Sequence, residues 1–172
     1  GYKLKKNLIL TGMMGSGKST IGKSLAERLN MEFVDIDTII EKKLSSSVAK
    51  IFETKGEEFF RKVEEEESIK FAGKDGLVIA LGGGAFINKT IREKIKKSSF
   101  SVWLQLDTDK LFERTKNNQK RPVLNRNKSK RELEKLYESR KKIYSLADFK
   151  IDCNGKTKNK IIEEIKKIYE NA

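Results

Sequence analysis

Apolar runs and longer amphipathic segments alternate along the chain. The apolar runs predict strands over residues 7–10, 32–37, 77–81, 100–106 and 148–152. Apolar residues at helical spacing predict helices that run to about residue 30, over 38–73, over about 88–97, around Leu111 and Phe112, over 133–146, and through Ile161 and Ile165. Because strands alternate with helices, we expect a single three-layer α/β/α domain over residues 1–172, with a central five-stranded parallel sheet. Ligands of such sheets bind at the carboxyl ends of the strands.

A glycine-rich turn joins the first predicted strand to the first predicted helix. Residues 8–20 read LILTGMMGSGKST and fit the pattern GxxxxGK[ST], with its fixed positions at Gly12, Gly17, Lys18 and Ser19. The backbone N–H groups of such a turn surround a phosphate group, and the lysine reaches the outer phosphates. The alternative is a plain glycine-rich turn, but the four positions would match by chance in roughly one chain of this size in a hundred. The order strand, turn, helix favours phosphate binding.

Two carboxylates follow the second apolar run. Alternation along a strand over 32–37 would place Asp35 and Asp37 on one side, at the edge of the sheet where the glycine-rich turn lies. One carboxylate can hold the waters of a Mg²⁺ ion whose other protein ligand is the Ser19 hydroxyl. The other can accept the proton of an attacking alcohol. The alternative is structural, because an aspartate here can cap a helix that begins near Thr38.

Three glycines at 82–84 follow the third apolar run. A backbone without side chains lets a ligand approach closely, and a loose turn is the alternative.

In the preceding helical segment Arg61 and Glu64 are three residues apart and share one side of a helix. A bare pair of this kind is a weak surface ion pair. We expect the acidic run 64–67 to be mostly a solvated face.

A long polar stretch over 114–131 contains many basic residues and the only proline of the chain, Pro122. A polar segment of this length inside a compact domain is usually functional or disordered. A mobile lid that closes over phosphate groups would explain both its charge and its length. A surface loop without a function is the alternative.

The composition narrows the chemistry further. The chain has 172 residues and a formal net charge of +13, but its lysines are spread over the predicted helix faces, so we expect a solvated surface and no nucleic-acid partner. The lack of histidine and the single Cys153 exclude zinc fingers and nucleophiles activated by histidine, and they favour a cytoplasmic setting. No apolar run reaches the roughly 18 residues of a membrane span, so we expect no membrane partner. A monomer is the expected state, since no segment has surplus apolar surface.

Six short motifs together resemble the shikimate kinase family. They are GSGKST at 15–20, DxD at 35–37, FRxxE at 60–64, GGG at 82–84, Arg-Pro at 121–122, and Arg140 four residues before Tyr144. Their order and spacing extend over nearly the whole chain. The resemblance implies a P-loop kinase fold of the nucleoside-monophosphate-kinase type. It also implies transfer of the ATP γ-phosphoryl group to the 3-hydroxyl of shikimate, with Mg²⁺ as the cofactor, as a step of aromatic amino acid biosynthesis.

The resemblance implies a role for each site residue. The residues expected to bind ATP are Gly15, Ser16, Gly17, Lys18, Ser19, Thr20, Arg114, Arg121 and Lys156, with Arg114 and Lys156 lining the adenine pocket. Ser19 would bind Mg²⁺, with Asp35 behind it through a water molecule. The residues expected to bind shikimate are Asp37, Arg61, Gly82, Gly83, Gly84 and Arg140, with the two arginines gripping the carboxylate. Asp37 would deprotonate the hydroxyl, while Lys18 and Arg121 stabilise the transferred phosphoryl group.

Two other functions stay open at this point. Another small-molecule kinase of this fold, of the gluconate or nucleotide type, would share the phosphate-binding turn and the lid, but it would not need two arginines directed at a carboxylate. A protein that binds ATP as a switch without catalysis would not need Asp37 as a base. Shikimate and ATP are therefore the expected small-molecule partners.

Overall fold

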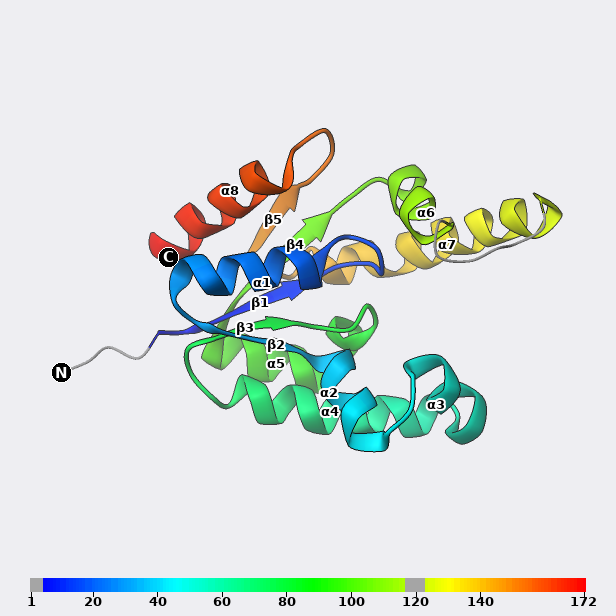
Figure 1. Ribbon diagram of the computed structural model, residues 1–172, viewed down its shortest axis with the longest axis horizontal. Helices are drawn as coiled ribbons and strands as arrows, with labels where there is room; N and C mark the ends of the chain where they lie inside the picture. The colour runs from blue at the N-terminus through cyan, green and yellow to red at the C-terminus, as the bar shows by residue number, and fades with distance from the viewer. Residues whose placement is uncertain (1–4, 117–122) are drawn as a thin grey trace.

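The computed structural model describes residues 5–116 and 123–172, and its centre is one parallel sheet (Figure 1). Within the described residues the strand order is β2-β3-β1-β4-β5, and every neighbouring pair is parallel. The strands are β1 Asn7–Thr11, β2 Glu32–Asp35, β3 Leu77–Ala80, β4 Ser99–Gln105 and β5 Phe149–Asp152. The predicted five-stranded parallel sheet is confirmed.

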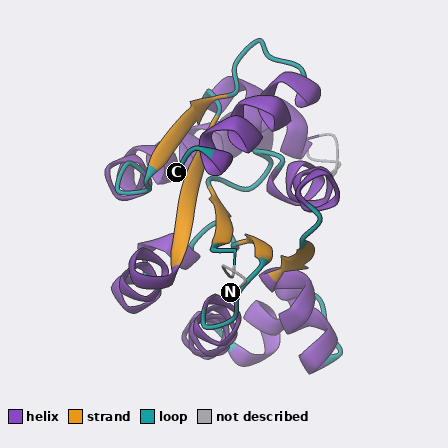
Figure 2. Cartoon of the chain, turned by 90° about the vertical axis from the view of Figure 1, so that its left-hand side faces the viewer, coloured by secondary structure: helices purple, strands orange, loops and turns teal. Residues whose placement is uncertain are grey.

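Helices cover both faces of this sheet (Figure 2). They are α1 Lys18–Leu29, α2 Ile36–Leu44, α3 Val48–Lys55, α4 Glu57–Ala72, α5 Lys89–Ser98, α6 Thr108–Lys116, α7 Val123–Tyr144 and α8 Lys158–Glu170, with the short 3₁₀ helix η1 at Ala85–Ile87. Helix α1 packs against α8, and α4 packs against α5. The chain thus forms the three layers of an α/β/α fold. Across the parts of the chain that are described, no helix is both long and apolar enough to span a membrane.

The core lies where the middle strands are covered on both faces. Leu8, Ile9 and Leu10 of β1 are completely buried, and every residue of β3 is buried. Such continuous apolar strands are typical of parallel sheets. Strand β1 leads directly into the glycine-rich turn, so the most buried strand of the sheet holds the turn in place.

The second strand ends earlier than the sequence pattern predicted. Its last residue is Asp35, which caps α2: the carboxylate Oδ1 accepts a hydrogen bond from the Thr38 N–H at 3.2 Å. Asp37 therefore lies in the first turn of α2, and the strand alternation by which we placed it is wrong. Helix capping, our structural alternative for this segment, occurs at Asp35.

The stretch over 114–131 is more regular than predicted. Its first residues belong to α6, and α7 begins at Val123 rather than at 133. The start of α7 has no apolar stripe that would reveal a helix, but α7 packs on α6, and the Lys130 Nζ lies 2.7 Å from the Asp109 Oδ1. Arg121 and Pro122, the central residues of the expected lid, lie outside the described residues. Movement of a lid stays a prediction.

A buried amide ties α4 to the sheet. The Asn7 side chain is completely buried and donates from Nδ2 to the backbone carbonyls of Ala72 at 3.3 Å and Lys74 at 2.7 Å. Its Oδ1 accepts from the Leu77 N–H at 2.9 Å. One side chain thus hydrogen-bonds both the carbonyl end of α4 and the first N–H of β3.

We expect Asn7→Ala to lower the free energy of unfolding by about 2–4 kcal/mol, because it leaves several buried backbone groups without a partner. Urea denaturation measures this loss. Asn171→Ala, at the exposed end of α8, is the control and should change stability by no more than about 0.5 kcal/mol. Equal effects of the two substitutions would contradict this role of Asn7.

Candidate active site

The glycine-rich turn has the backbone of a phosphate-binding loop. It leaves β1 at Gly12, whose φ is 146°, and enters α1 at Gly17, whose φ is 95°. A side chain at Gly12 would place its Cβ 2.9 Å from the Leu104 carbonyl oxygen, so only glycine fits there. The Ser16 N–H donates to the Met13 carbonyl at 3.1 Å. The N-terminus of α1 faces the loop, as the sequence predicted.

Lys18 is folded into this loop. Its Nζ donates to the carbonyl oxygens of Gly12 at 2.6 Å and Met13 at 3.0 Å. Burial lowers the pKa of Lys18 to about 8, although the negative charges of Asp37 and Asp35 act to raise it. A phosphate oxygen in the loop would offer the ammonium group a stronger partner than these two carbonyls.

Ser19 and Asp35 form an oxygen pair beside the loop. The Ser19 hydroxyl donates to Asp35 Oδ2, while the other carboxylate oxygen caps α2. Mg²⁺ prefers oxygen ligands and in kinases is usually bound by one or two protein groups together with the substrate phosphates and water. This hydroxyl and carboxylate, next to a phosphate loop, fit that requirement.

Asp37 and Glu64 meet at Gly82. Asp37 Oδ1 lies 2.7 Å and Glu64 Oε2 lies 3.0 Å from the point where a Cβ on Gly82 would stand, so only glycine leaves room for both. Both oxygens are buried, and neither has a hydrogen-bond partner among the described residues. Burial raises the pKa of both carboxyl groups, and for Asp37 the nearby charge of Asp35 raises it further.

Our prediction that Glu64 lies on a solvated face is wrong. It is 1 % exposed, and Glu67 is 4 % exposed. The Arg61 Nη1 donates to Glu64 Oε1 at 2.9 Å, so Glu64 fixes one side of the guanidinium group. The charge pattern of the sequence did not indicate this burial, because the chain has four consecutive glutamates. The packing of α4 decides which of them point inward.

Two guanidinium groups lie against the triglycine turn, residues 82–84. Arg61 lies against Gly84, with its Nη1 2.6 Å from where a Cβ would be, and Arg140 Nη1 lies 3.4 Å from the same point on Gly83. Both arginines line a cavity of about 560 Å³ together with Gly84 and Ser139. Among the described residues no carboxylate pairs with Arg140, whose guanidinium group lies beside the neutral hydroxyl of Tyr144, so its charge is available to an anion.

A second cavity of about 260 Å³ lies on the other side of the triglycine turn. Its walls are the phosphate loop with Lys18 and Ser19, the carboxylates Asp35 and Asp37, and Gly83. Gly83 thus lines the phosphate cavity and Gly84 lines the arginine cavity. The two cavities suit two anionic substrates that meet near Asp37.

Comparison with known proteins agrees with this geometry. A sequence model of the shikimate kinase family, described as "Shikimate kinase", matches residues 14–170. The chain belongs to the shikimate kinase family. It is 44 % identical to the shikimate kinase of Sulfurihydrogenibium sp. strain YO3AOP1 over 93 % of this chain and 95 % of the relative. It is 42 % identical to that of Persephonella marina over 93 % and 96 %.

Solved structures of shikimate kinases have the same fold. The enzyme from Acinetobacter baumannii, in complex with shikimate, superposes with a TM-score of 0.89 at 32 % identity, covering 97 % of this chain and 94 % of that one. The enzyme from Aquifex aeolicus gives a TM-score of 0.81 at 34 % identity, with 96 % of each chain covered. A gluconokinase from Sinorhizobium meliloti gives 0.56 at 15 % identity, with 99 % of this chain and 97 % of that one covered, a likeness of fold alone.

The two residues expected near the nucleotide base lie at different distances from the loop. Arg114, on α6, donates from Nη1 to the Gly15 carbonyl at 3.0 Å and so joins the phosphate loop. Lys156 instead lies 3.0 Å from Glu164 Oε2 of α8, and it lines neither of the two cavities. Burial raises the pKa of the Cys153 thiol to about 11, although the charges of Lys156 and Arg114 act to lower it. Their role in binding the base stays a prediction.

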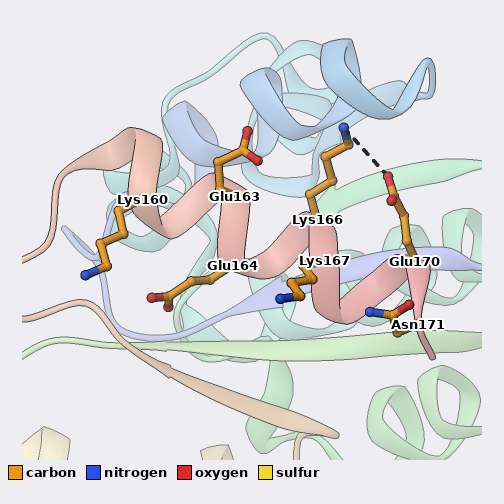
Figure 3. Close-up of a pocket in the computed structure, with 7 residues that line it drawn as sticks. All are labelled: Lys160, Glu163, Glu164, Lys166, Lys167, Glu170 and Asn171. Atoms are coloured by element: carbon orange, nitrogen blue, oxygen red, sulfur yellow. Dashed lines mark ion pairs between the residues drawn. The ribbon is translucent and has the colours of Figure 1, made fainter.

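A hollow along α8 shows how the lysine-rich surface is arranged (Figure 3). Lysines and glutamates alternate along it, and Lys166 lies 3.8 Å from Glu170. It contains no residue of the phosphate loop or of the triglycine turn. This face fits our interpretation of the dispersed lysines as solvated surface.

We expect the affinity of the protein for ADP to fall as the pH rises through the pKa of Lys18, because the neutral amine no longer attracts phosphate. Binding should be about ten-fold weaker at pH 9 than at pH 7. Isothermal titration calorimetry over this range measures the change. Lys18→Arg, whose guanidinium keeps its proton, is the control and should bind ADP with little dependence on pH. The same pH dependence in both proteins would contradict the assignment.

Proposed function

We propose that the protein transfers the γ-phosphoryl group of ATP to the 3-hydroxyl of shikimate and releases shikimate 3-phosphate and ADP. The observation that carries this proposal is the meeting of two cavities at the triglycine turn. One is lined by the phosphate loop and the other by two arginines, with Asp37 beside the turn. Membership of the shikimate kinase family supports the same substrates.

The phosphate loop binds the nucleotide in this proposal. The backbone N–H groups of residues 15–20 surround the phosphates, and Lys18 leaves its two loop carbonyls to hold the outer phosphate oxygens. Arg114 is already hydrogen-bonded to the loop and adds positive charge there. Arg121 would enter with the lid and stabilise the negative charge of the transferred group.

The metal ion of the reaction is Mg²⁺ in this proposal. Ser19 would bind it directly, and Asp35 would bind it through water, since these two side chains form the oxygen pair beside the loop. When bound, the ion neutralises charge on the phosphates.

The arginine cavity binds the acceptor. Arg61 and Arg140 hold the shikimate carboxylate, because a guanidinium group offers two parallel hydrogen bonds to a carboxylate. The backbone of Gly82, Gly83 and Gly84 receives the ring hydroxyls. The acceptor is thereby held between the two guanidinium groups and the phosphate cavity.

Asp37 acts as the base. Its Oδ1 is buried, has no hydrogen-bond partner in the described parts of the chain, and lies beside Gly82, where it can accept the proton of the 3-hydroxyl. The 3-oxygen forms a bond to the γ-phosphorus as the bond from that phosphorus to the bridging oxygen of ADP breaks. The raised pKa of Asp37 brings its proton affinity closer to that needed near neutral pH.

A monomeric state and a cytoplasmic location stay predictions from composition.

We expect Asp37→Asn to lose most of kcat, roughly 10²–10⁴-fold, because an amide cannot accept the proton. ADP binding should be kept, since the loop is unchanged. Steady-state kinetics with a coupled assay of ADP release, together with calorimetry for ADP, separate the two effects. A variant that keeps its kcat would favour a protein that does not use Asp37 as a base.

We expect Arg61→Ala and Arg140→Ala each to raise the KM for shikimate by roughly 10- to 100-fold, the loss of one charged hydrogen-bonded contact, with little change in the KM for ATP. The coupled assay measures both constants. Arg28→Ala is the matched control, because Arg28 carries the same charge at the far end of α1, where it pairs with Glu163.

The same assay should be run with gluconate and with nucleoside monophosphates as acceptors. Turnover of these in preference to shikimate would overturn the proposed substrate. Unchanged shikimate kinetics in both arginine variants would do the same.

A further inference from the structure

The triglycine turn has a defined backbone conformation. The Ala85 N–H donates to the Gly82 carbonyl at 3.1 Å, which closes a four-residue turn with Gly83 and Gly84 at its centre. Gly84 has φ −97° and ψ −6°, the values of the third residue of a type I turn. Gly83 is not among the glycines with a positive φ, which excludes a type II′ turn, so the turn is type I.

The sequence of this turn does not by itself select that conformation. A type II turn keeps the same closing hydrogen bond and differs mainly in a half rotation of the central peptide, here the peptide between Gly83 and Gly84. Type II needs a positive φ at its third residue, which glycine adopts as readily as a negative one. An interaction outside the turn must therefore favour one orientation of the central peptide.

Tyr144 makes that interaction. It is the last residue of α7 and is completely buried, and its hydroxyl donates to the Gly83 carbonyl, which is the carbonyl of the central peptide. Its ring packs on Trp103 with the ring centres 5.7 Å apart. After rotation of the peptide, the only acceptor left to the hydroxyl among the described residues would be the Met13 sulfur, 3.7 Å away and a weak acceptor, while Arg140 still donates to the tyrosine oxygen. The hydrogen bond thus opposes the rotation.

We propose that Tyr144 is a positioning residue that holds the Gly83–Gly84 peptide in the orientation needed for the acceptor. In a trans peptide the C=O and N–H point in opposite directions. With the carbonyl turned to Tyr144, the Gly84 N–H points away from it, and no protein group within the described residues accepts its hydrogen bond. This inference rests on the proposed function, in which an acceptor carrying hydroxyl groups and a carboxylate lies against Gly84.

The rotated peptide would present the wrong group to the acceptor. A carbonyl oxygen would face the cavity of Arg61 and Arg140 in place of an N–H, and it would repel an anion bound there. Because Gly83 lines the phosphate cavity and Gly84 lines the arginine cavity, the orientation of this one peptide affects binding of the acceptor more than binding of the nucleotide.

Tyr144→Phe tests the proposal, because it keeps the ring and removes only the hydroxyl. We expect the KM for shikimate to rise about three- to ten-fold, the effect of one neutral hydrogen bond, and the KM for ATP to change by less than about two-fold. Nitrogen-15 relaxation dispersion should also detect exchange at the Gly84 amide in the variant and not in the unmodified protein. If Tyr144 had a purely structural role, the substitution would leave the ratio of the two KM values unchanged and would cause no exchange at the Gly84 amide.

Tyr137→Phe is the matched control. It removes a hydroxyl from the same helix, one that accepts from Gln105 Nε2 at 3.3 Å and does not reach the triglycine turn. Its KM values and its Gly84 amide should match those of the unmodified protein.

Three outcomes separate the hypotheses. Absence of exchange at Gly84 in Tyr144→Phe overturns the positioning role even when the KM for shikimate rises, because loss of the contact between the hydroxyl and Arg140 would also raise that KM. A parallel rise of both KM values with a lower melting temperature overturns it too, since it indicates general loosening. If the unmodified protein does not phosphorylate shikimate, the proposed function fails, and exchange at Gly84 still decides whether Tyr144 selects the turn.

Discussion

Burial of opposite charges at the carboxyl edge of the sheet is the constraint on which the site depends. Lys18, Asp37 and Glu64 lie in surroundings that disfavour their charged forms, as the directions of their pKa shifts indicate. Each is close to groups of opposite charge that offset the cost of burying it. Removal of one group would leave a buried charge without a partner, so the arrangement is stable only as a whole. The sheet and the helices that carry these residues hold them in these positions.

The protein leaves room for these charges by using glycine where they converge. A side chain at Gly82 would collide with two carboxylates, and one at Gly84 would collide with a guanidinium group. Side chains with charge therefore approach the backbone directly, and the backbone amides become part of the binding surface. The same lack of side chains makes the turn ambiguous in conformation, which is why a tyrosine from a distant helix contacts it.

The sequence predicted well what depends on neighbours in the chain. The phosphate loop, the apolar strands and the helix pattern are local signals, and the structure has them. Asp37 was placed in a strand by the rule of alternation, but the bond of the Asp35 carboxylate to the Thr38 N–H caps a helix that begins at Ile36. The burial of Glu64 and the contact of Tyr144 with Gly83 join segments far apart in the chain, so no local pattern could reveal them.

The buried thiol of Cys153 has a practical consequence for measuring motion. It is the only cysteine in the chain, it is 4 % exposed, and its pKa of about 11 leaves almost no thiolate near neutral pH. Maleimide and other thiol reagents react with accessible thiolates, so we expect almost no reaction with the native protein. A single cysteine introduced on the surface would accept a fluorophore or spin label at one defined position, without first removing the natural residue.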